Sequence, residues 1–286
     1  MNILVLGAKG NLGTQIQKEF SPENNLISLD KKELDLLDFF AVEKKLNSLS
    51  LDLIINCAAY NNVDKCEEDK ESWNLALKLN AELPELLANI ALKNKIKLVH
   101  YSSDYVFGKE SRNDPYLEHE VPNPVNKYGY SKYMGEKGLE KLEARGLDYY
   151  LIRTSKLFGP KGYSQESKSS FFDIMLKLSE REEMLKVVDD EISAFTYTKD
   201  LAKHTKHLID KNYPIGIYHL INKGQATWYQ GAYELFKILK KDVKIEPSLA
   251  SDFPRPAKRP HYSVLANTKT RPLPYWKQAL RNYLLD

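Results

Sequence analysis

The fold is decided near the start of the chain, where residues 2–20 read NILVLGAKGNLGTQIQKEF. Five mainly apolar residues of strand length lead into a loop with Gly7, Gly10 and Gly13, and an amphipathic helical pattern follows at once. A strand, a glycine loop and a helix in this order bring backbone N–H groups and the positive end of the helix together. The pattern therefore predicts a site for the pyrophosphate of a dinucleotide.

Further apolar segments of strand length alternate with helical patterns over the first 150 residues. Strands that are apolar throughout, with helices between them, indicate a parallel sheet covered on both faces. We predict an α/β fold with a doubly wound, Rossmann-like sheet for residues 1–150. Residues 151–286 follow a looser pattern and are predicted to form mainly a smaller substrate-binding lobe, interleaved with the first domain. The remaining predicted strands of the sheet are 25–29, 53–56, 97–101 and 149–153.

Composition excludes several classes of protein. The formal net charge is +3, with 42 basic and 39 acidic residues interspersed, whereas nucleic-acid-binding proteins concentrate their cations. No apolar stretch approaches the ~18 residues of a membrane span. Cys57 and Cys66 have no companion residues at metal-ligand spacing, and reduced thiols are the simplest interpretation. We expect a cytoplasmic protein with neither nucleic acid nor membrane as a partner.

The residues after the second predicted strand bear on the choice of dinucleotide. Asp30 stands at about the distance from the glycines where an acidic residue accepts the ribose 2′-hydroxyl of NAD. Lys31 and Lys32 follow, and their charges suit a 2′-phosphate instead. Both NAD and NADP are therefore predicted as cofactors.

Two further segments offer a catalytic group. In NKYGYSKYMGEK, residues 126–137, Tyr128 and Lys132 are one helical turn apart, where the lysine charge would lower the pKa of the phenol. Ser102 and Ser103 end the fourth predicted strand, at the edge where doubly wound sheets bind ligands. Without other signals, a tyrosine and a lysine at this spacing are most often an exposed pair.

Several motifs in order carry a more specific signal. The glycine loop, NCAAYNNVDKCE, YSSDYVFG, PNPVNKYGYSKYMGEK, IRTSKLFG and PRPAKRPHYSVLAN together resemble the dTDP-4-dehydrorhamnose reductase family of the extended short-chain dehydrogenase/reductases, over nearly the whole chain. The resemblance implies NAD(P)H-dependent reduction of the C4 ketone of a nucleotide-linked 4-keto-6-deoxyhexose, most directly dTDP-4-dehydro-L-rhamnose to dTDP-L-rhamnose, in the synthesis of cell-surface polysaccharide.

The resemblance also implies roles for single residues. Tyr128 would donate a proton to the C4 carbonyl oxygen, Lys132 would bind the nicotinamide ribose and lower the pKa of Tyr128, and Ser103 would hydrogen-bond the same oxygen. Ser103 and Asp104 fall where the family contacts the sugar. The cofactor would meet Gly7, Gly10, Asn11, Leu12, Gly13, Asp30, Lys31, Asp35, Leu36, Ala58, Ala59, Tyr60 and Tyr101.

The substrate side departs from the family. Lys156 stands where the family usually has a tryptophan stacked on the sugar, and DEISAFT at 190–196 replaces the usual DQxGxPT. Arg255 and Arg259, in PRPAKRP, suit a nucleotide-sugar diphosphate, with an exposed basic loop as the alternative. The reaction class is therefore predicted more sharply than the sugar.

Other functions stay open at this stage. A C4 epimerase or another 4-ketoreductase would use the same tyrosine and lysine, and a non-catalytic NADP-binding regulatory subunit would keep the fold. A dehydratase fits less well, because Asp104 is followed by Tyr105 rather than by glutamate. Family members are associated with Mg²⁺ and with dimers, yet no local carboxylate cluster fixes either. We predict no metal site and leave a homodimer open.

Overall fold

The apolar strand segments form one parallel sheet in the order β2-β1-β3-β4-β5-β9. The computed structural model describes residues 1–29, 31, 33–109, 111–164 and 167–286. The strand order reverses between β1 and β3, and in such sheets ligands bind at this point, beyond the carboxyl ends of the strands. The predicted doubly wound α/β fold is confirmed. The strands are β1 Asn2–Leu6, β2 Asn25–Ser28, β3 Leu53–Asn56, β4 Lys97–Ser103, β5 Tyr149–Thr154 and β9 Gly216–His219.

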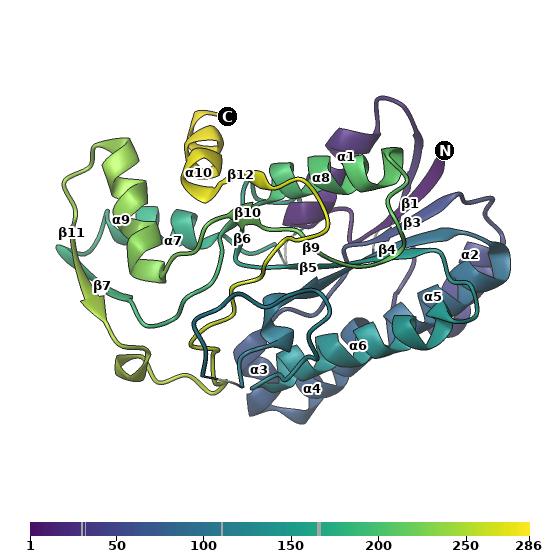
Figure 1. Ribbon diagram of the computed structural model, residues 1–286, viewed down its shortest axis with the longest axis horizontal. Coiled ribbons are helices and arrows are strands. Elements are labelled where there is room, and N and C mark those ends of the chain that lie inside the picture. Colours follow the sequence, from purple (N-terminus) through teal and green to yellow (C-terminus); the bar gives the residue numbers. More distant parts are fainter. Residues whose placement is uncertain (30, 32, 110, 165–166) are drawn as a thin grey trace.

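Helices cover both faces of this sheet (Figure 1). In β1, Ile3 and Val5 face the layer formed by α1 and α8, while Leu4 and Leu6 face the opposite layer. Because both faces are buried, the strands are apolar at successive positions instead of alternating. The helices of the two layers are α1 Asn11–Phe20 and α8 Thr198–Asp210 on one side, and α2 Phe39–Asn47, α5 Leu83–Asn94 and α6 Lys127–Glu143 on the other.

Shorter elements surround the amino-terminal end of α6. The turn η2 follows β4 directly, and both η1 and η2 contact α6, as do α3 and α4. In the described part of the chain, no helix combines the length and the apolar composition that a membrane span requires. These elements are α3 Val63–Glu68, α4 Lys70–Leu77, the π-helical turn η1 Lys78–Glu82 and the 3-10 turn η2 Asp104–Val106.

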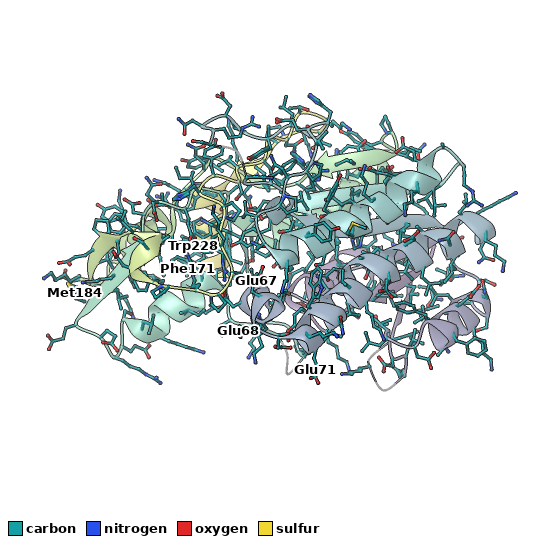
Figure 2. All side chains as sticks on the ribbon, turned by 90° about the horizontal axis from the view of Figure 1, so that it is seen from below. Glu67, Glu68, Glu71, Phe171, Met184 and Trp228 are labelled. Atoms are coloured by element: carbon teal, nitrogen blue, oxygen red, sulfur yellow. The ribbon has the colours of Figure 1, made fainter. Side chains whose placement is uncertain are left out.

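The second half of the chain builds a smaller lobe around an aromatic core that includes Phe158, Phe172, Phe195 and Trp276. Phe171 and Trp228 pack together in this lobe, with ring centroids 4.7 Å apart (Figure 2). Its strands pair in parallel as β6 with β8, β7 with β11 and β10 with β12. The elements are β6 Leu157–Phe158, α7 Phe171–Leu178, β7 Met184–Val188, β8 Thr196–Tyr197, β10 Asn222–Lys223, α9 Trp228–Leu239, β11 Lys244–Ser248, η3 Ala250–Asp252, β12 Leu273–Tyr275 and α10 Trp276–Leu285.

The chain crosses between the two parts more than once. The predicted division near residue 150 falls within β5, and both α8 and β9 from the second half complete the large sheet and its helical cover. Segments of the second half are therefore held directly at the carboxyl edge of the sheet, where the candidate site residues gather.

Candidate functional site

The glycine loop lies against the exit of β3 with no room for a side chain at Gly7 or at Gly13. Gly7 has a φ of +70°, and a Cβ there would lie 2.6 Å from the backbone nitrogen of Ala58. A Cβ on Gly13 would lie 2.2 Å from the carbonyl oxygen of Gly7. The N–H of Gly10 donates to that same carbonyl at 3.0 Å, and α1 begins at the next residue. The backbone thus forms a tight cradle at a helix N-terminus, which fits a pyrophosphate.

Asn11, the first residue of α1, uses its side chain within the protein. Its amide oxygen accepts a hydrogen bond from the Gly162 N–H and its amide nitrogen donates to the Lys168 carbonyl, both at 2.9 Å. Leu12 and Gly13 are buried. The backbone at the start of α1, rather than the Asn11 side chain, is therefore the part suited to a phosphate.

The residues predicted to contact the adenosine differ in their exposure to solvent, and not all of them lie within the described residues. Asp30 and Lys32 lie outside the described residues. Lys31 and Asp35 are exposed, and Asp35 accepts a hydrogen bond from the Leu37 N–H at 3.1 Å. Leu36 packs against the core beneath.

The segment after β3 lies beside the glycine loop and contains Ala58, Ala59 and Tyr60. The Tyr60 phenol donates to the Ser72 hydroxyl at 2.8 Å. The three residues therefore stand at the switch point of the sheet, where a bound dinucleotide would pass.

Tyr128 and Ser103 meet where α6 begins beside the end of β4. Asn126 caps the helix by accepting a hydrogen bond from the Gly129 N–H at 2.8 Å. A Cβ on Gly129 would lie 2.0 Å from the Tyr105 carbonyl oxygen, so glycine permits this approach. The Tyr128 phenol lies beside the Ser103 hydroxyl, and the Tyr105 ring packs edge-on against the Tyr128 ring, with centroids 5.8 Å apart.

The pKa of Tyr128 differs from the one predicted from the sequence. Burial raises the pKa of Tyr128 to about 12, and Lys132 is not among the groups that move it. The predicted lowering by the lysine is wrong for this structure, because the ammonium of Lys132 points elsewhere. It donates to the Tyr101 carbonyl at 2.6 Å, and burial lowers its own pKa to about 8.

Tyr101 contributes its backbone to the surroundings of Lys132, and its predicted contact with the cofactor stays a prediction. Its ring is buried, and its phenol is hydrogen-bonded to the Thr205 hydroxyl at 2.7 Å. What it offers the site is its carbonyl oxygen, which holds the Lys132 side chain. Tyr101 therefore orients the lysine, and its own side chain belongs to the core.

Asp104 is buried beneath serine hydroxyls. Its Oδ2 accepts hydrogen bonds from Ser155 at 2.8 Å and Ser263 at 2.6 Å, and its Oδ1 accepts one from Ser103 at 3.2 Å. Burial raises the pKa of its carboxyl group. The carboxylate thus orients Ser103 and ties the ends of β4 and β5 to the C-terminal segment, and its contact with the sugar stays a prediction.

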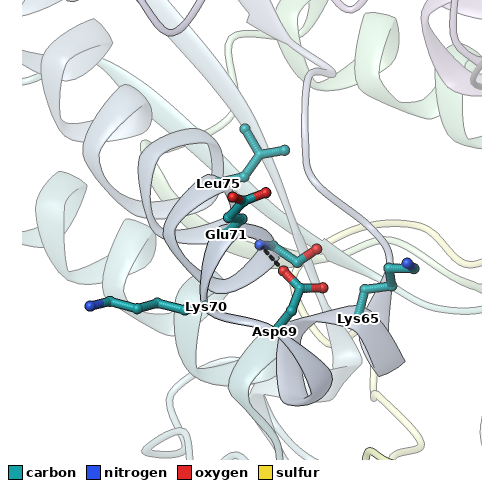
Figure 3. Close-up of a pocket in the computed structure, with 6 residues that line it drawn as sticks. Lys65, Asp69, Lys70, Glu71 and Leu75 are labelled. Carbon is teal, nitrogen blue, oxygen red and sulfur yellow. Dashed lines mark hydrogen bonds between the residues drawn. The ribbon is translucent and has the colours of Figure 1, made fainter.

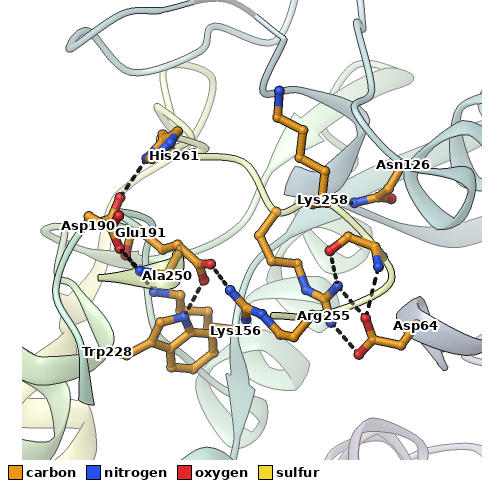
Figure 4. A network of polar contacts seen from close by, with 12 residues as sticks. Asp64, Asn126, Lys156, Asp190, Glu191, Trp228, Ala250, Arg255, Lys258 and His261 are labelled. Carbon is orange, nitrogen blue, oxygen red and sulfur yellow. Dashed lines mark hydrogen bonds and ion pairs between the residues drawn. The ribbon is translucent and has the colours of Figure 1, made fainter. Parts of the chain in front are cut away.

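A polar network joins Lys156, Glu191, Trp228 and Arg255 on the side of the smaller lobe (Figure 4). The Lys156 ammonium lies 3.9 Å from the centroid of the Trp228 ring, and burial lowers its pKa to about 7. Trp228 donates from Nε1 to Glu191 at 2.9 Å, and Arg255 pairs with the same carboxylate. Trp228 was not predicted from the sequence, because a tryptophan at the start of a helical pattern is typical of a core residue.

The second arginine of PRPAKRP is also paired. Arg259 donates from both terminal nitrogens to the Asp64 carboxylate on α3, each at 2.7 Å. Of the three basic side chains in the motif, Lys258 is exposed, whereas Arg255 and Arg259 are half-buried. The alternative of an exposed basic loop is therefore wrong for the two arginines, whose side chains are ordered by the carboxylates of Glu191 and Asp64.

Asn80 is a central residue that the sequence analysis missed. Its amide oxygen accepts from the Tyr60 N–H at 2.9 Å, and its amide nitrogen donates to the Tyr60 carbonyl at 2.9 Å and to the Ser131 hydroxyl at 3.0 Å. Ser131 in turn donates to the Tyr128 carbonyl at 2.7 Å. Asn80 thus joins the exit of β3 to α6. The sequence gives little indication of this role, because the pattern of a π-helical turn cannot be told from that of an ordinary helix.

Other features carry no part of this site. Among the described residues, no group of three His, Cys, Asp or Glu side chains is arranged to hold a metal ion. A surface depression beside α3 and α4 includes Asp69, whose carboxylate accepts from the Ser72 N–H at 2.6 Å (Figure 3). None of the predicted site residues lines it; its lining is Lys65, Asp69, Lys70, Glu71, Ser72 and Leu75.

Comparison with known proteins adds to this geometry. The family described as "RmlD substrate binding domain" matches residues 1–286. The dTDP-4-dehydrorhamnose reductase of Escherichia coli K12 is 33% identical over 99% of this chain and 97% of its own length. A probable dTDP-4,6-dihydroxy-2-methyloxan-3-one 4-ketoreductase of Streptomyces antibioticus is 34% identical over 100% and 95%.

A solved structure agrees with these relatives. The dTDP-4-dehydrorhamnose reductase of Bacillus anthracis, in complex with NADP, is 32% identical and superposes with a TM-score of 0.91 over 99% of this chain and 98% of that one. The resemblance predicted from the motifs is confirmed over the full described fold. This chain belongs to the dTDP-4-dehydrorhamnose reductase family.

Proposed function

We propose that this protein reduces the C4 ketone of a nucleotide-linked 4-keto-6-deoxyhexose with NADPH or NADH, most directly dTDP-4-dehydro-L-rhamnose to dTDP-L-rhamnose. The observation that carries the proposal is the adjacent pair of hydroxyls, Tyr128 and Ser103, at the carboxyl edge of the sheet. Relatives named as dTDP-4-dehydrorhamnose reductases support it across nearly the whole chain.

The protonation state of Tyr128 suits a reduction. With a pKa raised to about 12, the phenol carries its proton at neutral pH and is a donor rather than a base. A ketone that accepts a hydride becomes an alkoxide, so a donor placed at its oxygen acts mainly in the transition state. Tyr128 would supply the proton, and Ser103 would hydrogen-bond the same oxygen.

The cofactor in this proposal supplies the hydride when bound. The cradle of Gly7, Gly10 and Gly13 suits its pyrophosphate, and Lys132 would hold the nicotinamide ribose beside Tyr128. Exposed Lys31 near the end of β2 favours a 2′-phosphate, and a relative was solved with NADP. We therefore propose NADPH as the preferred donor.

The substrate would extend from Tyr128 toward the lobe formed mainly after residue 150. Arg255 and Arg259, each ordered by a carboxylate, would meet the diphosphate, and Lys156 and Trp228 would meet the sugar. The two cysteines are free, which agrees with a reducing, cytoplasmic location.

Light scattering of the purified protein measures whether it acts as a homodimer.

The test is a cofactor-oxidation assay across nucleotide-linked 4-keto sugars that differ in base and in sugar, with NADPH and NADH in parallel. We expect turnover with dTDP-4-dehydro-L-rhamnose and faster oxidation of NADPH than of NADH. Product analysis of the C4 configuration identifies the sugar formed. Absence of turnover with every 4-keto sugar, despite NADPH binding, would favour a regulatory subunit instead.

A second candidate is another dTDP-sugar 4-ketoreductase. Lys156 in place of the tryptophan usual in the family, together with the similarity to the Streptomyces antibioticus protein, favours it. The same panel separates the two, since the preferred 4-keto sugar would then carry a different substituent pattern. An epimerase would interconvert C4 epimers without net oxidation of NADPH.

A further inference from the structure

One fully buried ion pair lies directly behind the proposed active site. Among the ion pairs of the described residues, that of Glu136 on α6 with Arg153 on β5 is the most buried, with side chains 0% and 1% exposed. Arg153 donates from Nε to Oε1 at 3.0 Å and from Nη2 to Oε2 at 2.8 Å. Both carboxylate oxygens are thus fixed by one guanidinium, which leaves Glu136 little freedom to turn.

Apart from Glu136, the groups that contact the Arg153 guanidinium carry no negative charge to neutralise it. Its Nη1 lies 3.3 Å from the Glu118 carbonyl and 3.3 Å from Nε2 of His219. Nδ1 of His219 faces the Ala266 carbonyl at 3.0 Å, so Nδ1 carries the proton and Nε2 accepts from Arg153. Burial and Arg153 together hold the pKa of His219 well below its usual value, so the ring is neutral. Glu136 is therefore the carboxylate that balances this cluster.

Glu136 is also one helical turn from Lys132 on α6. The Lys132 side chain is 2% exposed, and a buried ammonium loses its charge unless a carboxylate opposes the cost of burial. Among the groups that counteract the lowering of the Lys132 pKa by burial, the Glu136 carboxylate has the largest effect. Two other titratable groups of the described residues interact with Lys132, the Cys57 thiol after β3 and the His100 ring on β4, and burial keeps both neutral.

We propose that Glu136, clamped by Arg153, is a positioning residue that keeps the Lys132 side chain charged and aligned with the proposed nicotinamide ribose. The inference rests on the proposed function, because the ribose contact belongs to it. Arg153 fixes the carboxylate, the carboxylate opposes the loss of charge on Lys132 one helical turn away, and the Tyr101 carbonyl sets the direction of the ammonium. Glu136 and Arg153 touch neither the proposed substrate nor the proposed cofactor and act only through Lys132.

Glu136→Gln tests this directly, with Glu140→Gln as the matched control. Glu140 lies one further turn along α6 and pairs with exposed Lys137, so its variant removes the same charge from the same helix. In the ligand-free protein, NMR titration of isotope-labelled lysine follows the Lys132 side chain. We expect its midpoint to fall by about one unit or more in Glu136→Gln and to stay unchanged in Glu140→Gln.

The same shift is expected in two functional measurements. NADPH affinity of Glu136→Gln should fall about threefold just above neutral pH, approach a roughly tenfold loss near pH 9, and recover in mild acid, where Lys132 regains its proton. The alkaline limb of kcat/KM should move to lower pH by the same amount. A purely structural role predicts lower thermal stability with an unshifted lysine titration and an unshifted limb, and that result would overturn the inference.

A second variant covers the case in which Glu136→Gln does not fold. Glu136→Gln with Arg153→Met removes both charges of the pair and leaves no uncompensated buried ion. Its Lys132 midpoint should move in the same direction, and a midpoint equal to that of the wild type would contradict the proposal. The lysine titration needs no substrate, so failure of the proposed reductase activity and failure of this inference give different results.

Discussion

Tyr128 is a single phenol whose removal leaves its surroundings intact, because its ring packs against Tyr105 whether or not it carries a hydroxyl. In Tyr128→Phe we expect kcat to fall at least about a hundredfold, since the variant loses the general acid. NADPH affinity, measured by fluorescence titration, should stay close to that of the wild type. A variant with full turnover would remove the phenol from the mechanism.

Lys156 is the residue at which substrate preference should change. Its ammonium covers the Trp228 ring at 3.9 Å, in the position where the family usually has an aromatic side chain. Lys156→Trp should shift kcat/KM in the sugar panel toward dTDP-4-dehydro-L-rhamnose, because a ring would again face the sugar. Lys156→Met, which keeps length without a ring or a charge, is the control. Equal preferences in wild type and Lys156→Trp would refute the argument.

At the scale of the elements, the packing of α1 against β1 depends on the glycines of the first crossover. A Cβ on Gly13 would lie 2.2 Å from the Gly7 carbonyl, whereas a Cβ on Gly10 would lie 3.3 Å from the same oxygen. Gly13→Ala must therefore push α1 away from β1, at a cost of about 1–3 kcal/mol in the free energy of unfolding. We expect a clearly smaller loss for Gly10→Ala in urea unfolding, and NADPH binding should weaken more in Gly13→Ala. Equal losses would show that the close approach of α1 is not what requires glycine.

At the scale of the whole molecule, the Arg259–Asp64 pair joins the C-terminal segment to α3. The hydrogen bond from Arg259 lowers the pKa of Asp64 below its usual 3.8. A lowered carboxyl pKa stabilises the fold at pH values above the unfolded value, and this contribution is lost as the pH falls through the folded value. Asp64→Asn should thus cost about 1 kcal/mol near neutral pH.

The cost should disappear in strong acid, where the wild-type carboxylate is itself protonated. Urea unfolding at both pH values measures the difference between the two proteins. Glu68→Gln, an exposed residue on the same helix, is the control and should change little. A cost of Asp64→Asn that is the same at both pH values would mean that the ion pair does not account for it.

The local pattern of the sequence determined the fold class and the family. Residues 2–20 predict strand, glycine loop and helix because apolar spacing and glycine conformation are local properties, and the structure confirms the doubly wound sheet. Motif order predicted the family, which full-length relatives confirm. The roles of Tyr128, Ser103 and Lys132 were also predicted, and they stay predictions until the variants are measured.

Tertiary structure alone decided the electrostatics and the partners of the site. The sequence places Lys132 one turn from Tyr128, but the direction of its ammonium depends on the Tyr101 carbonyl, 31 positions earlier. Likewise, Asp104 is covered by Ser263, 159 positions away, and Glu136 is clamped by Arg153 on another strand. Burial and long-range contact set a pKa and the direction of a side chain, and neither is a property of spacing along the chain.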